Sequence, residues 1–373
     1  MKLEPFQLER YFARHEFSTP YLLSCSDCES MSIDELLTMT PEAKERFLSQ
    51  RLGYTQSSGS PELRHAIANL YDQVIADHIL VHAGAEEAIF NFMHTVLEPG
   101  DEVVVHAPRY QSLGEVARGI GAKVISWEAD PEKDWALDID FLDKCLTPKT
   151  RAVVVNFPHN PTGFLPELQF VSALSELSSK HGFIIFSDEV YRGLEYDSSY
   201  RLPAFADINA QAVSLGVMSK TYGLAGLRIG WIATRNKTVY HRMAAFKDYT
   251  TICNSAPSEF LANLALEHHE SIANRNVSII EANLRFIQGF FDRHADMFRW
   301  QAPKAGPIAF PHYLGGNVDD LCLNLVEKAG VLLVPGSYFG HNGECFRIGF
   351  GRSNLPACLE QLDKYLNRFG SDL

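Results

Sequence analysis

Short apolar runs rich in β-branched residues alternate along the chain with stretches in which apolar residues recur every three or four positions. The first pattern predicts β-strands, and the second predicts amphipathic helices. Runs such as RAVVVN and GFIIFS are apolar at nearly every position, which is typical of strands buried on both faces of a mostly parallel sheet. Seven strands are predicted, at 79–82, 102–106, 123–127, 151–156, 183–187, 212–217 and 229–234.

Helical spacing is clear in residues 63–74 and 167–180. Beyond about residue 255 the pattern changes to long helices at 256–270 and 277–294, short strands in VLLVPG and CFRIGF, and a closing helix from Leu355. We therefore expect an α/β fold with two domains. A large domain over 45–255 would contain the mostly parallel sheet, and a smaller α+β domain would combine 256–373 with an N-terminal arm, 1–44, that packs on it or on a partner subunit.

Composition and net charge limit the classes of molecule that the protein is expected to bind. The 373 residues are 46% hydrophobic, and 33 Lys and Arg against 46 Asp and Glu give a net charge of −13. That charge disfavours nucleic acid and anionic lipid, so small molecules are the expected partners. No apolar run approaches the roughly 20 residues of a membrane span. The opening MKLEPFQLERYFARHEF lacks the apolar core of a signal peptide, so we expect a cytoplasmic protein.

The seven cysteines are an odd number spread over the chain, which favours reduced thiols over a disulfide framework. Cys25 and Cys28 form a C-x-x-C, but no second such pair completes a zinc site and no strand precedes it as in redox folds, so no metal is expected.

Four common catalytic and nucleotide-binding motifs are also absent: G-x-G-x-x-G, G-x-x-x-x-G-K-[ST], G-x-S-x-G and H-E-x-x-H. Their absence removes the usual support for dinucleotide, nucleotide and hydrolase sites.

The remaining candidates for a functional site are polar residues at the ends of predicted strands, because open α/β sheets bind their ligands there. Lys220 follows an apolar strand, and in a cleft its amine would have a pKa lowered by desolvation and could form a Schiff base. Taken alone, Lys220 fits an ordinary surface lysine better, since most lysines are exposed. Arg228 and Ser219 could bind a phosphate through charge-assisted hydrogen bonds, although Arg228 could also serve in a structural ion pair.

Asp188 ends the apolar strand FIIFS, and a buried carboxylate is costly unless it meets a cation. A protonated pyridine nitrogen is such a cation, and the ring then accepts electrons from a carbanion. Tyr191 could donate to a ring oxygen or be a core aromatic, and Asn156 could donate there or cap a turn. Gly84 opens a helix, whose free N–H groups favour a phosphate, although a turn without a ligand has the same pattern.

The ordered set GYTQSSGSPELRHAIA, GAEEAI, NFPHNPTG, DEVY, SKTYGLAGLRIGW and FRIGF resembles the class I/II aminotransferases, which have the type I pyridoxal-phosphate fold. The resemblance runs from about Tyr54 to Arg347. ERYF, NFPHNP, AFPHY and VLLVPGSYFG are in addition similar to capreomycidine synthase-like enzymes. The resemblance implies pyridoxal 5′-phosphate as cofactor, with Lys220 holding it as an aldimine and moving the proton between Cα and C4′.

The same resemblance implies roles for the other residues. Asp188 would bind the pyridine nitrogen, Asn156 and Tyr191 the phenolic oxygen, and Arg347, together with Asn156, the substrate. Tyr110 would stack on the ring, and Tyr54 would reach the phosphate of a neighbouring subunit, which implies a homodimer. The phosphate itself would lie on the backbone of Gly84, Ala85 and Glu86, with Ser219 and Arg228.

Glu86 departs from the family pattern, because several relatives have a small hydroxyl residue there. We expect its side chain to turn away from the phosphate, so that only its N–H contributes.

The resemblance implies transfer of an amino group between an L-amino acid and a 2-keto acid. The alternative within the same cofactor class is β-elimination or cyclisation of an amino acid, as in capreomycidine synthase-like enzymes. A non-catalytic module that binds the cofactor and senses amino acids is a third hypothesis. The set Lys220, Asp188, Tyr191, Arg228 and Arg347 argues against it, as does the lack of a recognisable DNA-binding segment.

Overall fold

A computed structural model describes residues 2–341 and 343–369. Its centre is a seven-stranded sheet in the order β2-β8-β7-β6-β5-β3-β4. β8 runs antiparallel to both its neighbours, and the other pairs are parallel. The strands are β2 (Ile79–His82), β3 (Glu102–Ala107), β4 (Lys123–Glu128), β5 (Thr150–Asn156), β6 (Ile184–Asp188), β7 (Val213–Val217) and β8 (Gly230–Thr234). The α/β fold with a mostly parallel sheet is thus confirmed, and each strand lies within one residue of its predicted ends.

Alternate residues of the central strands enter two different cores, one on each face of the sheet. In β5, Val154 packs with α5 and α6, whereas Val153 and Val155 pack with α7 and α8. This burial on both faces explains why RAVVVN is apolar at nearly every position. The helices around the sheet are α4 (Pro61–Ala68), α5 (Ala85–Val96), α6 (Ser112–Ile120), α7 (Ile139–Cys145), α8 (Leu168–His181), α9 (Phe205–Ile208) and α10 (Lys237–Lys247).

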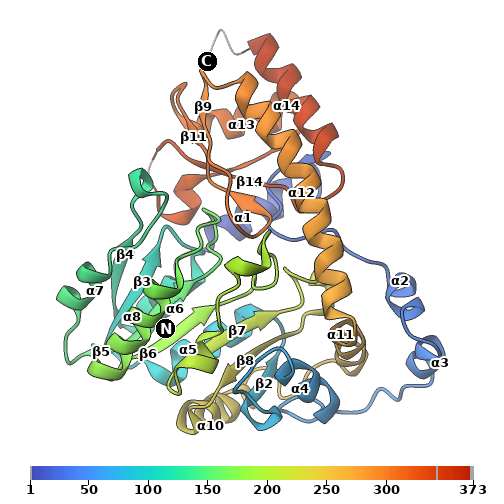
Figure 1. Cartoon of the computed structure of the whole chain (residues 1–373), viewed down its shortest axis with the longest axis vertical. Helices are drawn as coiled ribbons and strands as arrows, with labels where there is room; N and C mark the ends of the chain where they lie inside the picture. The colour runs from blue at the N-terminus through green and yellow to red at the C-terminus, as the bar shows by residue number, and fades with distance from the viewer. Residues whose placement is uncertain (1, 342, 370–373) are drawn as a thin grey trace.

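The C-terminal part of the chain lies above this sheet in Figure 1, with the long helix α12 running down one side. Its helices are α11 (Ala256–Glu267), α12 (His269–Arg293), α13 (Val318–Ala329) and α14 (Leu355–Phe369). Its short strands are β9 (Phe298–Arg299), β10 (Ile308–Ala309), β11 (His312–Tyr313), β12 (Val331–Leu332), β13 (Val334–Pro335) and β14 (Phe346–Gly349). Five 3-10 turns in the described residues complete the elements: η1 (Ala76–His78), η2 (Pro131–Lys133), η3 (Ser198–Tyr200), η4 (Ala225–Leu227) and η5 (Gly336–Phe339).

Two predicted helix boundaries were wrong. The helix predicted over 63–74 ends at Ala68, because the backbone N–H groups of Asp72 and Gln73 donate to the Asp207 carboxylate instead of continuing the helix. The helix predicted from residue 277 begins at His269, since Ile272 and Asn276 are buried and extend its inner face by two turns. Across the helices that the structure describes, none is long and apolar enough to cross a membrane.

The N-terminal segment forms α1 (Gln7–His15), β1 (Tyr21–Leu22), α2 (Ile33–Thr38) and α3 (Ala43–Leu48). β1 pairs in parallel with β12, and the Gly349 N–H donates to the Leu23 carbonyl at 2.6 Å. The first strand of the chain is therefore joined to elements more than 300 residues away. The domain boundaries after residues 44 and 255 stay a prediction.

A substitution at Gly349 tests the attachment of the N-terminal segment to β14. An added Cβ there would overlap the Cys25 carbonyl, so Gly349→Ala must push the N-terminal segment away from β14. We expect the free energy of unfolding to fall by about 2 kcal/mol, which is typical of overpacking. Urea denaturation measures it, with Gly289→Ala as the control, because a Cβ there meets only the flexible end of Arg293. Equal stability of both variants would contradict this packing.

Candidate active site

The carboxyl ends of β5, β6 and β7 bring three of the predicted residues to one edge of the sheet. Asn156 and Asp188 are register partners on neighbouring strands, and the Asn156 amide donates to the Asp188 carbonyl at 2.8 Å. Lys220 follows β7 by three residues. Parallel strands place their carboxyl ends side by side, which explains how residues so far apart in sequence meet.

Asp188 is a buried carboxyl group, 7% exposed. One of its oxygens accepts the Val190 backbone N–H at 3.2 Å. Burial raises the pKa of Asp188 to about 7, and the nearby Lys220 opposes that rise. A carboxyl group held in this way is suited to pair with a cation.

Lys220 lies in the interior of the site. Its Nζ donates to Ser26 Oγ at 2.8 Å. Burial lowers the pKa of the Lys220 amine, while the charge of Asp27 raises it and that of Arg347 lowers it further. An amine with a lowered pKa is available as a nucleophile and base.

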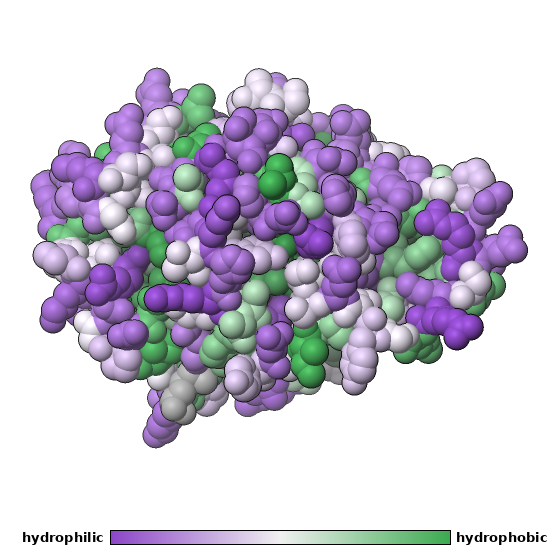
Figure 2. Space-filling view, turned by 90° about the horizontal axis from the view of Figure 1, so that it is seen from below, coloured by the Kyte–Doolittle hydropathy of each residue, from purple (hydrophilic) through white to green (hydrophobic). Residues whose placement is uncertain are grey.

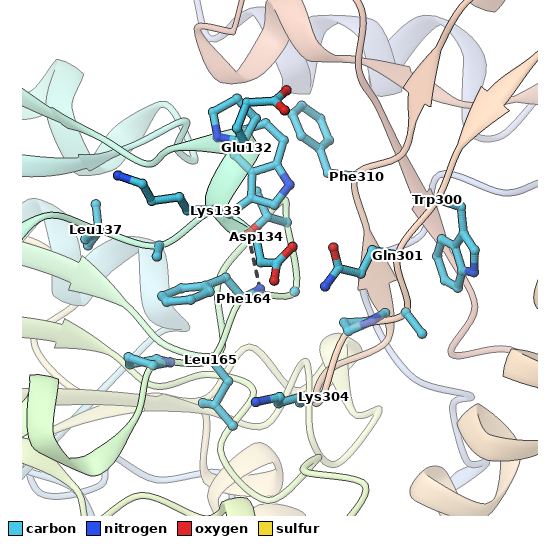
Figure 3. Close-up of a pocket in the computed structure, with 18 of the residues that line it drawn as sticks. Glu132, Lys133, Asp134, Leu137, Phe164, Leu165, Trp300, Gln301, Lys304 and Phe310 are labelled. Atoms are coloured by element: carbon cyan, nitrogen blue, oxygen red, sulfur yellow. Dashed lines mark hydrogen bonds between the residues drawn. The ribbon is translucent and has the colours of Figure 1, made fainter.

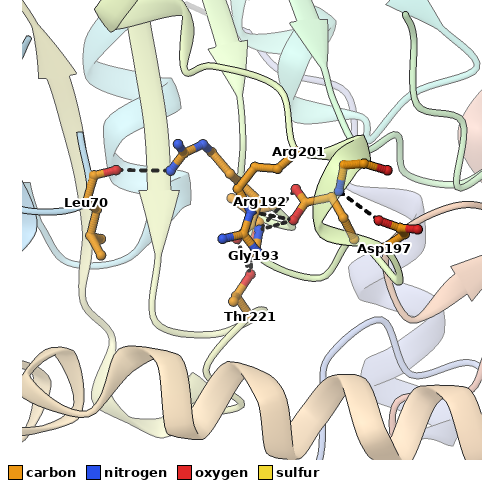
Figure 4. Close-up of polar contacts among 9 residues, drawn as sticks. Leu70, Arg192, Gly193, Asp197, Arg201 and Thr221 are labelled. Carbon is orange, nitrogen blue, oxygen red and sulfur yellow. Dashed lines mark hydrogen bonds and ion pairs between the residues drawn. The ribbon is translucent and has the colours of Figure 1, made fainter. Parts of the chain in front are cut away.

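The turn that carries Lys220 is tied to the turn after β6. Thr221 Oγ1 donates to the carbonyls of Val190 and Arg192, at 3.1 and 2.9 Å. The Arg192 guanidinium in turn reaches the Leu70 carbonyl at 3.1 Å (Figure 4). The positions of Lys220 and Asp188 are therefore set by one connected network.

Tyr191 is fully buried, and its phenol donates to the Ser26 carbonyl at 2.9 Å. Burial raises the pKa of Tyr191, so the phenol keeps its proton. Tyr110 Oη donates to the Glu9 carboxylate at 3.0 Å, and the Phe6 ring lies 5.0 Å from the Tyr110 ring.

Gly84 and Arg228 form a concave positive site at the N-terminus of α5. Gly84 caps this helix with a φ of 88°, and an added Cβ would lie 2.6 Å from an Arg228 guanidinium nitrogen. Only glycine allows so close an approach with this backbone conformation. Ala85 begins the helix, and Ser219, 9% exposed, precedes Lys220. The guanidinium and the helix dipole both favour an anion here.

The Glu86 carboxyl group points toward α6, where it accepts a hydrogen bond from Ser112 Oγ at 3.1 Å. Burial raises the pKa of Glu86 to about 7, against the lowering effect of Ser112 and Arg228. Near neutral pH it is therefore partly protonated, which weakens its repulsion of an anion.

Arg347 on β14 is 1% exposed. Its two terminal nitrogens donate to Asn160 Oδ1 at 3.1 Å and to the Ser24 carbonyl at 2.8 Å. Its buried Nε has no hydrogen-bond partner among the described residues. Phe339 lies under the guanidinium at 5.0 Å. Arg347 thus retains hydrogen-bonding capacity for a carboxylate.

Tyr54 is the one predicted residue that lies apart from the others within the described chain. It is 94% exposed and lies on the surface between α3 and α4. The structure brings the remaining predicted residues together, from Gly84 to Arg347.

Sequence reasoning missed the contribution of the N-terminal segment. Ser26, between Cys25 and Cys28, accepts from both Lys220 and Tyr191. Asp27 forms an ion pair with Arg352 at 2.9 Å. Both cysteines are buried free thiols, and burial raises the pKa of Cys25 to about 12. The C-x-x-C spacing pointed to this segment, but it gave no reason to choose Ser26.

A cavity of about 550 Å³ lies elsewhere, between the 131–137 loop, residues 162–167 and residues 299–304. Figure 3 shows Asp134, Gln301 and Lys304 around it. It does not include Lys220, Asp188 or Arg347 in its lining. Side-chain chemistry, rather than cavity size, therefore identifies the candidate site.

The residues at the sheet edge fit pyridoxal 5′-phosphate. The buried Asp188 carboxyl matches a pyridine nitrogen, the Gly84–Arg228 cradle matches a phosphate, and the desolvated Lys220 amine matches an aldehyde.

Comparisons with known proteins agree with this chemistry. The family model for aminotransferase class I and II matches residues 24–361. Capreomycidine synthase of Streptomyces vinaceus is 32% identical over 93% of this chain and 88% of that protein. The aspartate/prephenate aminotransferase of Thermus thermophilus is 31% identical over 88% of this chain and 87% of its own length.

Solved structures extend the similarity to the whole fold. A PLP-dependent aminotransferase from Streptococcus suis matches with a TM-score of 0.93 and 30% identity, over 99% of each chain. The PLP-dependent cyclase OrfR matches with a TM-score of 0.88 and 31% identity, over 99% of this chain and 98% of that one. The predicted family, enzyme class and cofactor are confirmed: the chain belongs to the class I and II aminotransferases and is a pyridoxal-phosphate-dependent enzyme.

Proposed function

We propose that this enzyme transfers an amino group between an L-amino acid and a 2-keto acid, with Lys220 as the catalytic residue. The observation that carries the proposal is the buried Lys220 amine beside Asp188 and Arg347 at one edge of the sheet. When bound, pyridoxal phosphate supplies a ring that accepts electrons from the substrate Cα and so makes its proton acidic.

Lys220 would hold the cofactor covalently and, when freed by the substrate amine, would act as general base and acid. Its lowered pKa favours the neutral amine, which would take the Cα proton and deliver it to C4′ of the cofactor. Ser26 Oγ, 2.8 Å away, orients Nζ.

Asp188 would keep a proton on the pyridine nitrogen, and Asn156 and Tyr191 would donate to the phenolic oxygen of the cofactor. Arg347 would bind the substrate α-carboxylate, with Asn156 beside it, because a guanidinium can contact both carboxylate oxygens. Burial of Arg347 against Phe339 supports this role, since it excludes water from that ion pair.

The phosphate would be held by the backbone of Gly84, Ala85 and Glu86 with Ser219 and Arg228, and Tyr110 would stack on the ring.

We further infer a homodimer in which Tyr54 of a second copy reaches this phosphate. The support is a set of large apolar side chains that one chain leaves exposed: Leu48, Leu52, Tyr54, Tyr249 and Ile252. We place the enzyme in the cytoplasm, where its seven free thiols stay reduced.

Cyclisation or β-elimination of an amino acid is the second candidate. The similarity to capreomycidine synthase and to the cyclase OrfR favours it. The early proton transfer from Cα to Lys220 is common to both reactions. Incubation with amino acids distinguishes them: product that forms only when a keto acid acceptor is present supports transamination, whereas ring closure or loss of water without an acceptor supports the alternative.

Lys220→Ala should lower turnover by about 10⁴-fold, because the proton carrier is removed. The purified variant should also lack the visible absorption band of a covalently held cofactor. Lys237→Ala, an exposed lysine of α10, is the control and should retain both. Wild-type turnover in the Lys220 variant would refute the assignment.

Asp188 gives a pH-dependent prediction for the cofactor-free protein. Its pKa is raised from 3.8 to about 7, so between these pH values the folded protein holds a proton that the unfolded chain has lost. The stability that this bound proton contributes is present below about pH 4 and is lost as pH rises from about 4 through 7. Asp188→Asn removes that loss. We therefore expect its Tm, relative to wild type, to rise by several degrees between pH 5 and pH 8. Calorimetry with and without cofactor measures this; a constant difference would contradict the buried carboxyl assignment.

Arg347→Lys should reduce kcat/KM for amino acids by about 100-fold, mostly through KM, because a lysine cannot bind both carboxylate oxygens. A primary amine without a carboxylate should react as slowly with the variant as with wild type. Arg299→Lys, which alters a surface ion pair, serves as the control. Equal losses for both substrates would instead indicate general damage to the site.

A further inference from the structure

The turn that follows α10 is bonded to the segment that carries Tyr54. Thr55 Oγ1, one residue after this tyrosine, donates to the Asn254 carbonyl at 3.0 Å. Lys247, the last residue of α10, is 1% exposed, and its Nζ donates to the Ser57 carbonyl at 2.9 Å. Two hydrogen bonds therefore fix the Tyr54 segment to the end of α10 and to the turn beyond it.

The same turn has a strained backbone at Ile252. This β-branched residue has a φ of 64°, a conformation that such side chains rarely adopt. Lys247 bonds to both of its backbone groups, since Nζ donates to the Ile252 carbonyl at 3.1 Å and the Lys247 carbonyl accepts the Ile252 N–H at 3.2 Å. Strained conformations persist where the surrounding structure holds them, so the shape of this turn depends on Lys247.

Glu87 connects the same turn to the Gly84 cradle. Its Oε1 accepts the hydroxyl groups of Thr250 and Thr251, the second at 2.7 Å. Its Oε2 accepts the Ala83 N–H at 2.5 Å. Ala83 directly precedes Gly84, whose φ of 88° shapes the cradle. The Glu87 carboxylate therefore holds the strand-to-helix turn on one side and the turn after α10 on the other.

A glutamate at the third position of a helix can serve simply as a cap. Glu87 fills that role through Oε2, but Oε1 is bonded to hydroxyl groups outside α5. Burial would raise the pKa of Glu87, but hydrogen bonds from Thr250, Ala83 and Thr251 outweigh it and lower the pKa overall. The group is thus a carboxylate bonded on both sides, and the bonds of Oε1 are not needed to cap the helix.

We propose that Glu87 is a positioning residue for the cofactor phosphate, which locks the Gly84 cradle to the turn that holds the Tyr54 segment. This inference rests on the proposed function, because it requires the phosphate to lie on Gly84. A cradle that is ordered before binding holds a phosphate more tightly, since no ordering cost is incurred on binding. Because Tyr54 would reach the phosphate of a second copy, the contacts from Glu87 to Lys247 would fix both contributions of one chain relative to each other.

The test is the dissociation constant of pyridoxal phosphate for the full-length protein. Glu87→Met keeps the length of the side chain and removes both acceptors. We expect the dissociation constant to rise about tenfold, because the Gly84 turn is no longer ordered before binding. Pyridoxal, which has the same ring and aldehyde but no phosphate, should bind the variant as well as it binds wild type. Visible absorption during titration of the cofactor-free protein measures both ligands.

Glu87→Gln is the conservative variant. Its amide oxygen can accept the Ala83 N–H while its amide nitrogen donates to the threonine hydroxyls. The affinity for pyridoxal phosphate should therefore return to within about threefold of wild type, which loss of charge alone would not predict.

The combined substitutions Thr250→Val and Thr251→Val remove the other side of the same contacts and leave α5 unchanged, so they cover the case in which Glu87→Met folds poorly. We expect the same selective loss of affinity for pyridoxal phosphate, and a less than additive loss when Glu87→Met is added, because both changes break one linkage. Glu98→Gln removes an exposed charge just beyond the far end of α5 and serves as the control, with neither affinity changed.

Unchanged affinity for pyridoxal phosphate in both Glu87→Met and the double threonine variant would overturn the inference. Equal losses for pyridoxal phosphate and pyridoxal would also overturn it, since they would show general damage rather than a looser phosphate site. Wild-type protein that binds no pyridoxal phosphate would instead refute the proposed function, so the two failures are distinguishable.

Discussion

The burial of charged groups at one edge of the sheet is the constraint on which the site depends. Asp188 and Arg347 are buried and Lys220 is partly buried. Desolvation acts on the pKa of all three, and an unpaired buried ion costs several kcal/mol. Their pKa values accordingly move toward the neutral forms. A cofactor with a cationic nitrogen and an aldehyde would match Asp188 and Lys220, and a substrate carboxylate would match Arg347. Under the proposed function, the free-energy cost of burying these groups would therefore favour such ligands over others.

Three regions of the chain contribute to the burial of these groups. The sheet supplies its floor through Asn156 and Asp188, and β14 supplies Arg347 from the C-terminal part. The N-terminal segment adds two hydrogen bonds, because the Ser24 carbonyl accepts from Arg347 and Ser26 Oγ accepts from Lys220. Three regions of the chain thus converge on one small volume, and none of them forms the site alone.

The N-terminal segment is attached to both parts of the chain. The residues proposed to bind the cofactor lie on strand ends and turns. α1 packs Leu8 and Tyr11 into a core beside the sheet and forms hydrogen bonds to both parts of the chain. The solved structures similar to this chain include both an aminotransferase and a cyclase, so one fold supports more than one reaction.

The sequence alone determined the sheet, and it predicted most residues of the proposed cofactor site. Strands such as β5 are apolar at nearly every position because both faces are buried, and a polar residue such as Asp188 at a strand end is a local signal. Helix ends were less certain, since Asp207 stops α4 through a contact 135 residues away.

Only the tertiary structure revealed the contacts of Glu9, Ser26 and Asp27. No sequence motif marks these residues, and their hydrogen bonds reach across about 100 to 300 residues of chain. Periodicity and spacing report local order, whereas the electric field at Lys220 depends on which distant charges the fold brings to it.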